Sequence, residues 1–233
     1  MALFTIADLH LSLGTSKPMD VFKGWQNYVE RIEANWRSRI KPEDTVVLGG
    51  DISWAMQLEE TLADFSFLQG LPGQKIMLKG NHDYWWTTMA KMNAFLERNN
   101  LTTLRFLFNN SYPLEGAWLC GTRSWLFDPG QAHDAKIIQR ETGRLRASLQ
   151  AAGQGEKIVF LHYPPVYTGA EAPEIIQAMK EFGVKRCYYG HLHGASIGRA
   201  VQGVVGGIRY KLVSADSLEF DPVPVPLKEE IIW

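Results

Sequence analysis

The sequence predicts an α/β protein in which helices pack on mixed β-sheets. Short runs rich in apolar and β-branched residues, which indicate buried strands, alternate with longer stretches whose apolar residues recur at helical spacing. Later runs, beginning at Leu104 and again at Ile197, follow one another without intervening helical stretches. Such runs indicate antiparallel additions, so the sheets should be mixed.

The first half of the chain alternates strand and helix regularly. Its strand-like runs are short and apolar, and they lie at 3–7, 45–48 and 75–78. In the first helical stretch, apolar residues such as Val29, Ile32 and Trp36 form one face, and Pro42 prevents the helix from continuing. The predicted helices are 21–40, 58–68 and 85–98.

The second half is less regular. The segment 121–134 reads as irregular, 197–213 as glycine-rich and β-like, and the residues around Pro222, Pro224 and Pro226 as an extended tail. The predicted helices are 135–152 and 174–182. The predicted strands are 104–108, 117–120, 158–161 and 185–189.

Bulk composition is that of a globular protein with a large core. With 233 residues, 45% hydrophobic and 21% charged, the chain is expected to form one domain over 1–233. Cys120 and Cys187 lie in apolar runs and read as buried thiols. Asp8 and His10 interrupt the apolar start too early for a signal peptide, and no run is long enough to span a membrane. We therefore expect a cytoplasmic protein.

Polar residues with metal-binding or proton-transfer chemistry follow the predicted strands. Five of the six histidines lie there, and we expect the sixth, His133, at the surface. Because the carboxyl ends of strands line the crevice of an open α/β sheet, these side chains should converge despite their separation in sequence. The candidate ligands are Asp8, His10, Asp51, Asn81, His162, His191 and His193.

This mixture of carboxylate, imidazole and amide oxygen suits divalent first-row metals better than magnesium alone. Seven ligands are too many for one tetrahedral site. They fit two ions, about 3.5–4 Å apart, that share a bridging carboxylate. Manganese, iron, zinc and nickel are the expected metals.

Five motifs occur in order between positions 8 and 193: Asp8-x-His10, Gly50-Asp51, Gly80-Asn81-His82-Asp83, His162 and Gly190-His191-x-His193. Together they resemble the signature blocks of the calcineurin-like metallophosphoesterase superfamily. The resemblance implies a four-layer α/β/β/α sandwich with two mixed β-sheets and a dinuclear metal site at the strand ends.

The resemblance also implies a role for each matching residue. Asp51 would bridge the two metals. His82 would contact the phosphate or protonate the leaving group, with its ring oriented by Asp83. The first metal would be held by Asp8, His10 and His193, and the second by Asn81, His162 and His191.

Other residues near these motifs are candidates for the substrate rim. Trp54, Trp85 and Trp86 follow ligand motifs closely and could stack on a leaving group, although packing beneath the loops is an equal alternative. Arg123 lies in a loop after a strand and could bind phosphate, with a surface salt bridge as the alternative. Tyr163, beside His162, is a similar open case.

We expect a metal-dependent phosphoesterase that hydrolyses a phosphomonoester or phosphodiester by attack of a metal-bridging hydroxide. The alternatives are a non-catalytic binding scaffold on the same fold and a nuclease. A scaffold has no need of complete ligands or of His82. The net charge of −1 disfavours long nucleic acid as a partner. With no separate cap domain visible, a small phosphoester is the expected substrate.

Overall fold

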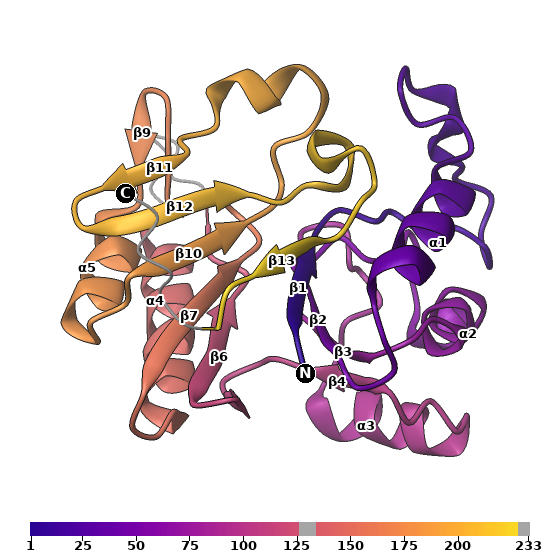
Figure 1. The fold of residues 1–233 in the computed structure, drawn as a ribbon, viewed down its shortest axis with the longest axis horizontal. Coiled ribbons are helices and arrows are strands. Elements are labelled where there is room, and N and C mark those ends of the chain that lie inside the picture. The colour runs from indigo at the N-terminus through magenta and orange to yellow at the C-terminus, as the bar shows by residue number, and fades with distance from the viewer. Residues whose placement is uncertain (126–133, 228–233) are drawn as a thin grey trace.

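Two β-sheets form the centre of the molecule (Figure 1). The computed structural model describes residues 1–125 and 134–227. The first sheet has four parallel strands and one antiparallel edge strand. Its spatial order is β13 (Val223–Val225), β1 (Leu3–Ile6), β2 (Thr45–Leu48), β3 (Gln74–Met77) and β4 (Leu104–Phe106).

The second sheet also has a parallel centre, with an antiparallel strand at each edge. Its order is β11 (Gly203–Val205), β12 (Ile208–Leu212), β10 (Arg186–Tyr189), β7 (Glu156–Leu161), β6 (Ala117–Thr122) and β5 (Tyr112–Leu114). A separate hairpin joins β8 (Val166–Tyr167) to β9 (Ala170–Glu171).

Helices cover the outer face of each sheet, which completes the predicted four-layer sandwich (Figure 1). The helices over the first sheet are α1 (Tyr28–Arg39), α2 (Leu62–Gly70) and α3 (Met89–Arg98). Those over the second sheet are α4 (Asp134–Ala151) and α5 (Pro173–Glu181). Short 3-10 turns occur at Met19–Val21, Leu58–Thr61, Gly194–Arg199 and Ala215–Leu218.

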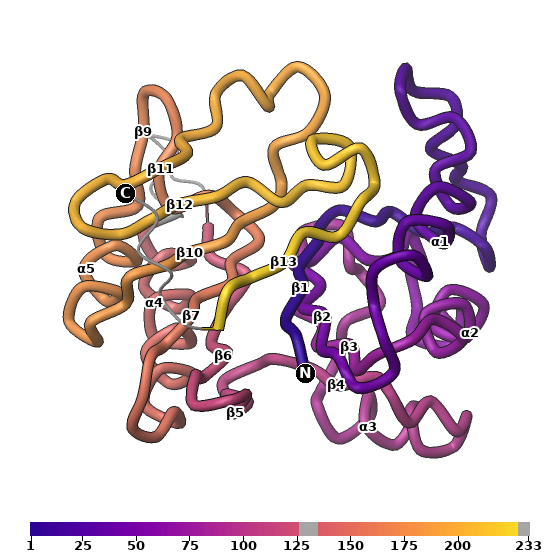
Figure 2. The backbone as a smooth tube through the Cα atoms, in the orientation of Figure 1, coloured from indigo at the N-terminus to yellow at the C-terminus, as the bar shows by residue number. Residues whose placement is uncertain are grey.

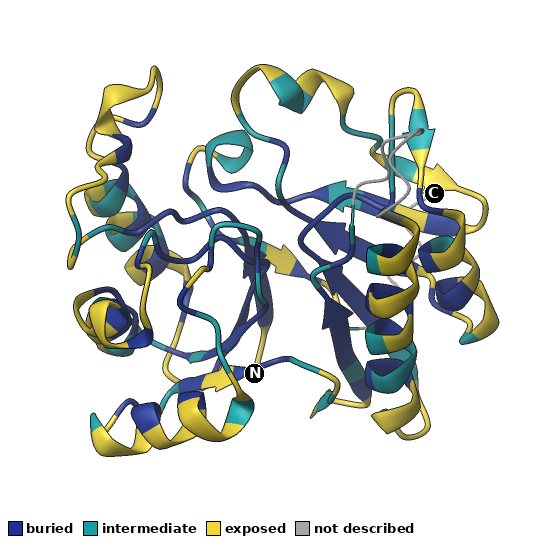
Figure 3. Cartoon of the chain, turned by 180° about the vertical axis from the view of Figure 1, so that it is seen from behind, coloured by how far each residue is buried: buried dark blue, intermediate teal, exposed yellow. Residues whose placement is uncertain are grey.

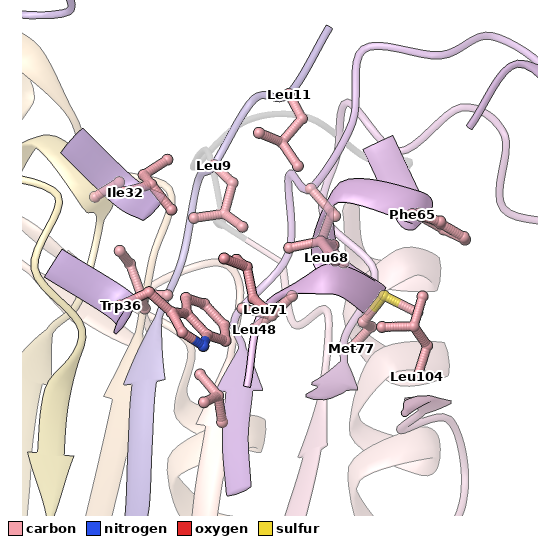
Figure 4. Close-up of a cluster of buried hydrophobic side chains, with 14 of the residues drawn as sticks. Leu9, Leu11, Ile32, Trp36, Leu48, Phe65, Leu68, Leu71, Met77 and Leu104 are labelled. Atoms are coloured by element: carbon pink, nitrogen blue, oxygen red, sulfur yellow. The ribbon is translucent and has the colours of Figure 1, made fainter. Parts of the chain in front are cut away.

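Three buried clusters fill the spaces between the four layers, which is why the central strands are apolar on both faces. In β7, Ile158 and Phe160 pack between the sheets, whereas Val159 and Leu161 pack against the helices. Figure 3 shows these central strands buried, with exposed residues in loops, at the sheet edges and on the outer sides of the helices. Figure 4 shows the cluster between the first sheet and its helices, where Trp36 of α1 lies against Leu48 of β2.

The C-terminal segment connects the two sheets. From β12 the chain continues through a backbone bridge between Ser214 and Ala7 and then runs antiparallel to β1 as β13 (Figure 2). Pro224 is tolerated there because β13 is an edge strand. The predicted extended tail is thus partly a strand.

Two predicted helices start later than expected. The stretch 21–40 becomes helical only at Tyr28, since Gly24 and Asn27 adopt left-handed conformations with φ of 90° and 51°. The stretch 85–98 begins at Met89, where the Thr88 hydroxyl accepts a hydrogen bond from the backbone N–H of Lys91 (3.4 Å).

The expectation that the strand from Leu104 would be antiparallel is wrong. β4 runs parallel to β3 because α3 provides the crossover between them. In the two large sheets, the antiparallel strands are instead β5, β11 and β13. The sheets are mixed, as predicted, through their edge strands.

Both cysteines are buried free thiols, as expected. His133 lies outside the described residues, as does most of the predicted irregular segment 121–134. Within the described ranges, no helix has the length and apolar character needed to cross a bilayer.

Candidate metal centre

All seven predicted ligands lie in loops at the carboxyl ends of parallel strands. Asp8 and His10 follow β1, Asp51 follows β2, and Asn81 follows β3. In the second sheet, His162 follows β7, and His191 and His193 follow β10. The two sheets therefore bring their ligand-bearing loops to one shared edge of the sandwich.

Left-handed backbone conformations recur at these positions. Outside glycine such conformations are uncommon and cost on the order of 1–3 kcal/mol each, somewhat less for aspartate, so they persist only where surrounding structure holds them. Four of the seven candidate ligands have positive φ: Asp8 (58°), His10 (46°), Asp51 (51°) and His191 (70°). The backbone is bent where the ligands must turn toward one another.

Asp51 lies between two groups of ligand side chains. Its Oδ2 is 3.8 Å from His10 Nε2 and 3.5 Å from His162 Nε2. Asp8 Oδ1 is 3.9 Å from His162 Nδ1. In the described parts of the chain, Asp8, Asp51 and His162 each offer one ligand atom, all within 4.8 Å of one another.

The remaining ligands divide between the two sides of Asp51. On one side, Asn81 Oδ1 is 2.6 Å from His162 Nε2 and 2.9 Å from His191 Nδ1. On the other side, the His10 and His193 rings lie 5.4 Å apart between centroids. The side chains therefore group on two sides of Asp51, and the assignment of each ligand to one of two ions stays a prediction.

The chemistry of these donors fits divalent cations. Asp8 Oδ1, Asp51 Oδ2 and both ring nitrogens of His10 are buried and have no hydrogen-bond partner among the described residues. Burial, reinforced by the charge of Asp51, raises the pKa of Asp8 well above its usual value, and burial raises the pKa of Asp51 to about 6. Burial also lowers the pKa of His10, and that of His162 to about 3. Buried carboxylates beside neutral imidazoles lack the compensating charge that cations would supply.

The second oxygens of both aspartates hold neighbouring loops together. Asp8 Oδ2 accepts the backbone N–H of His191 at 2.8 Å, which joins a loop of one sheet to a loop of the other. Asp51 Oδ1 accepts the backbone N–H of His82 at 2.7 Å. Each aspartate thus has one oxygen committed to the protein and one oriented among the ligand atoms.

The predicted role of Asp83 as the residue that orients the His82 ring is wrong. Asp83 is fully buried, and its carboxylate accepts the backbone N–H groups of Gly80 (2.7 Å), Asp51 (2.9 Å) and Ile52 (2.9 Å), together with the Trp85 indole N–H (3.0 Å). Burial and the charge of Asp51 raise the Asp83 pKa to about 7. Asp83 acts as the anchor between the loops after β2 and β3.

The His82 side chain lies beside the candidate ligand His10. Its ring is partly exposed, 5.6 Å from the His10 ring and 4.5 Å from the Trp54 ring. Its Nδ1 has no hydrogen-bond partner in the described residues. Its role in catalysis stays a prediction.

Two of the five predicted rim residues lie against the ligands, whereas the Arg123 side chain forms an ion pair with Glu141 at 3.6 Å. Trp54 stacks on the His10 ring at 4.8 Å, and Tyr163 lies 4.2 Å from the His191 ring. Arg123 accepts the backbone N–H of Tyr163 with its carbonyl oxygen at 2.9 Å.

Trp85 and Trp86 have other positions. Trp85 is only 2% exposed and packs edge-on against Phe65, so its predicted place on the rim is wrong. Trp86 packs on Phe106 and, with Tyr84, lines a separate groove of about 550 Å³ whose walls contain none of the seven ligands. The alternative interpretation, that these tryptophans pack beneath the loops, therefore agrees with their positions.

Sequence reasoning missed two residues that hold His10. The Tyr28 hydroxyl donates to the His10 carbonyl at 3.0 Å, and the Trp25 ring lies 5.9 Å from the His10 ring, edge-on. Trp25 carried only a core-packing signal and Tyr28 none, so the sequence did not distinguish them from other helix residues.

Gly80 provides a sharp test of this arrangement. A Cβ added to Gly80 would lie 2.0 Å from Asp51 Oδ1 and 2.2 Å from Asp51 N, so Gly80→Ala must displace the loop that carries Asp51. Metal affinity should fall by more than about 10-fold, because even outer-shell changes have effects of this size. Gly143→Ala is the control, since a Cβ there meets nothing within 4 Å in α4. Metal titration of both variants checks the result, and equal affinities would contradict the close approach at Gly80.

A four-layer sandwich with carboxylate, imidazole and amide donors at its shared strand edge defines a metallophosphoesterase. The model of the calcineurin-like phosphoesterase family matches residues 1–195, and the chain belongs to that family. No curated protein matches the chain significantly in sequence.

Solved structures share the fold at low sequence identity. The phosphopantetheinyl hydrolase of Mycobacterium tuberculosis is 15% identical, with a TM-score of 0.60 and coverage of 100% of this chain and 98% of that one. A protein of unknown function from Aquifex aeolicus is 16% identical, with a TM-score of 0.51 and coverage of 96% and 95%. A protein from Thermus thermophilus is 12% identical, with a TM-score of 0.56 and coverage of 97% and 98%.

Proposed function

We propose that this protein hydrolyses a small phosphomonoester or phosphodiester in a reaction that depends on two divalent metal ions. The observation that carries the proposal is the position of Asp51 Oδ2, buried without a hydrogen-bond partner in the described residues between His10 and His162. Family membership supports metal-dependent phosphoester hydrolysis in general. The ion count, the type of ester and the mechanism are our inference.

Each of the seven candidate ligands has a role in holding the metals. Asp8, His10 and His193 would hold one ion, Asn81, His162 and His191 would hold the second, and Asp51 would contribute to both. Bound there, the ions would supply Lewis-acid activation of a water nucleophile and neutralise charge on the phosphoryl oxygens. Manganese, iron, zinc and nickel suit this donor set.

Residues of the chain would orient the substrate and supply a proton donor. The His82 ring offers Nδ1, which has no hydrogen-bond partner in the described residues, while Asp51 holds the backbone N–H of His82. A proton on this imidazole would be transferred to the departing oxygen of the ester. Trp54 would wall the mouth beside it, because its ring contacts both His10 and His82.

We also propose that residues 1–233 act as one catalytic domain in the cytoplasm. Support for a single domain comes from the ligand set, which draws on the loops of both sheets. The net charge of −1 supports a small phosphoester as the partner and disfavours long nucleic acid.

Metal content and hydrolysis test the proposal together. Protein stripped with a chelator and then reconstituted separately with manganese, zinc, nickel, iron or magnesium should bind about two ions per chain. It should then hydrolyse at least one member of a panel of p-nitrophenyl monoesters and diesters, nucleotides and cyclic nucleotides. The metal-free protein should be inactive. Full activity without metal would overturn the metal role, and inactivity with every metal would favour the binding scaffold.

A further inference from the structure

A group of basic side chains gathers around one buried carboxylate of α4. Glu141 is 0% exposed and accepts a hydrogen bond from the Thr122 hydroxyl at 2.8 Å. Three guanidinium groups approach its Oε1: Arg144 at 2.6 Å, Arg123 at 3.6 Å and Arg140 at 3.8 Å. Among the described side chains, this group therefore has an excess of positive charge.

Lys79 adds a further cation. It lies between β3 and Gly80, is half-buried, and has no carboxylate within ion-pairing distance in the parts of the chain that the structure describes. Its neighbour Leu78 packs against β6, since a Cβ added to Gly121 would lie 3.0 Å from Leu78 Cδ2, so Lys79 follows β3 beside the loop that carries Arg123. The single carboxylate of Glu141 does not balance the charges of three arginines and a lysine, so the group favours a further anion.

The basic group is continuous with the metal centre. Arg123 holds Tyr163 through a backbone hydrogen bond of 2.9 Å, and the Tyr163 ring lies 4.2 Å from His191. The Arg123 guanidinium lies over the Trp125 ring at 5.1 Å, and Trp125 is 5.1 Å from Tyr163. The group thus borders the side of the centre that contains His191.

We propose that Lys79, Arg123 and Arg144, with Arg140 at the exposed edge, form a subsite for a second phosphate group of the substrate. This inference rests on the proposed function, because the metal centre binds the phosphate that reacts. Guanidinium groups pair with phosphate oxygens through two parallel hydrogen bonds, and the lysine ammonium adds a point charge. The substrate class is then a phosphoester that carries an additional phosphate.

Matched substrates with and without a second phosphate test the subsite. For monoesterase activity the pair is adenosine 3′,5′-bisphosphate and adenosine 5′-monophosphate. For diesterase activity it is thymidine 5′-(p-nitrophenyl phosphate) with and without a 3′-phosphate. Metal-loaded wild type should prefer the second-phosphate member by at least about 10-fold in kcat/KM, since a charge-assisted contact has that size.

Charge-removing variants should lower this preference. Lys79→Met and Arg144→Met should each reduce the ratio of the two kcat/KM values by about 10-fold, mainly through KM. Arg146→Met is the matched control, because Arg146 is also on α4 but pairs with Glu181 of α5. If Arg144→Met fails to fold, Lys79→Met still provides the test, since Lys79 has no ion pair in the described structure.

The outcomes separate the two proposals. Absence of hydrolysis of all four substrates, and of the wider panel, would overturn the proposed function. Hydrolysis with a wild-type ratio near one, or an equal loss on both substrates in Lys79→Met, would overturn the subsite and leave the function intact.

Discussion

Asp51→Asn is expected to weaken binding of both metal ions and to abolish hydrolysis. Asp51 Oδ2 lies within 3.8 Å of His10 Nε2 and 3.5 Å of His162 Nε2, so its loss removes negative charge from both sides of the centre. Because outer-shell changes alone lower metal affinity by about 10–100-fold, loss of a shared ligand should exceed about 100-fold. Metal analysis after dialysis measures how many ions remain per chain.

Two comparison variants make this result specific. Asp8→Asn should mainly weaken one ion, because Asp8 is assigned to one side only. Asp44→Asn removes another buried carboxylate, which accepts the backbone N–H groups of Ala2 and Lys41 far from the ligands in the fold, and it should retain both metals. Equal loss of a single ion in Asp51→Asn and Asp8→Asn would remove the shared role from Asp51.

His82→Asn is expected to retain both metals and lower the rate by roughly 10²–10⁴, the usual contribution of general acid–base catalysis. The substitution preserves the backbone N–H that Asp51 accepts at 2.7 Å, so the loop should stay in place. The loss should be smaller for p-nitrophenyl esters than for alkyl esters, because p-nitrophenolate departs with little protonation.

Three measurements distinguish the roles open to His82. Loss of metal in His82→Asn would make His82 a ligand. An equally large rate loss for good and poor leaving groups would leave only stabilisation of charge in the transition state. No rate loss with either ester would remove His82 from catalysis.

The local interactions of Asp83 lay beyond sequence reasoning. Because His82 and Asp83 are adjacent in the motif Gly80-Asn81-His82-Asp83, the sequence suggested that Asp83 holds the His82 ring. Adjacent side chains in a turn, however, point apart. The folded chain turns Asp83 inward, where the N–H groups of Asp51 and Ile52 need an acceptor. Those donors come from a loop some 30 residues earlier, and no local pattern indicates them.

By itself, the sequence predicted the layered α/β architecture, which the structure confirms, and seven candidate ligands, which the structure brings to one edge of the sandwich. Buried strands need apolar residues on both faces, and ligands need particular side chains at the strand ends, so both leave residue types at recognisable places. Only the tertiary structure decided where helix α1 begins, that β4 is parallel, and that Trp85 is core. It also decided that three arginines gather around Glu141. Those features depend on left-handed turns, crossover connections and long-range packing, which arise from contacts between residues distant in the chain and leave no periodic pattern in it.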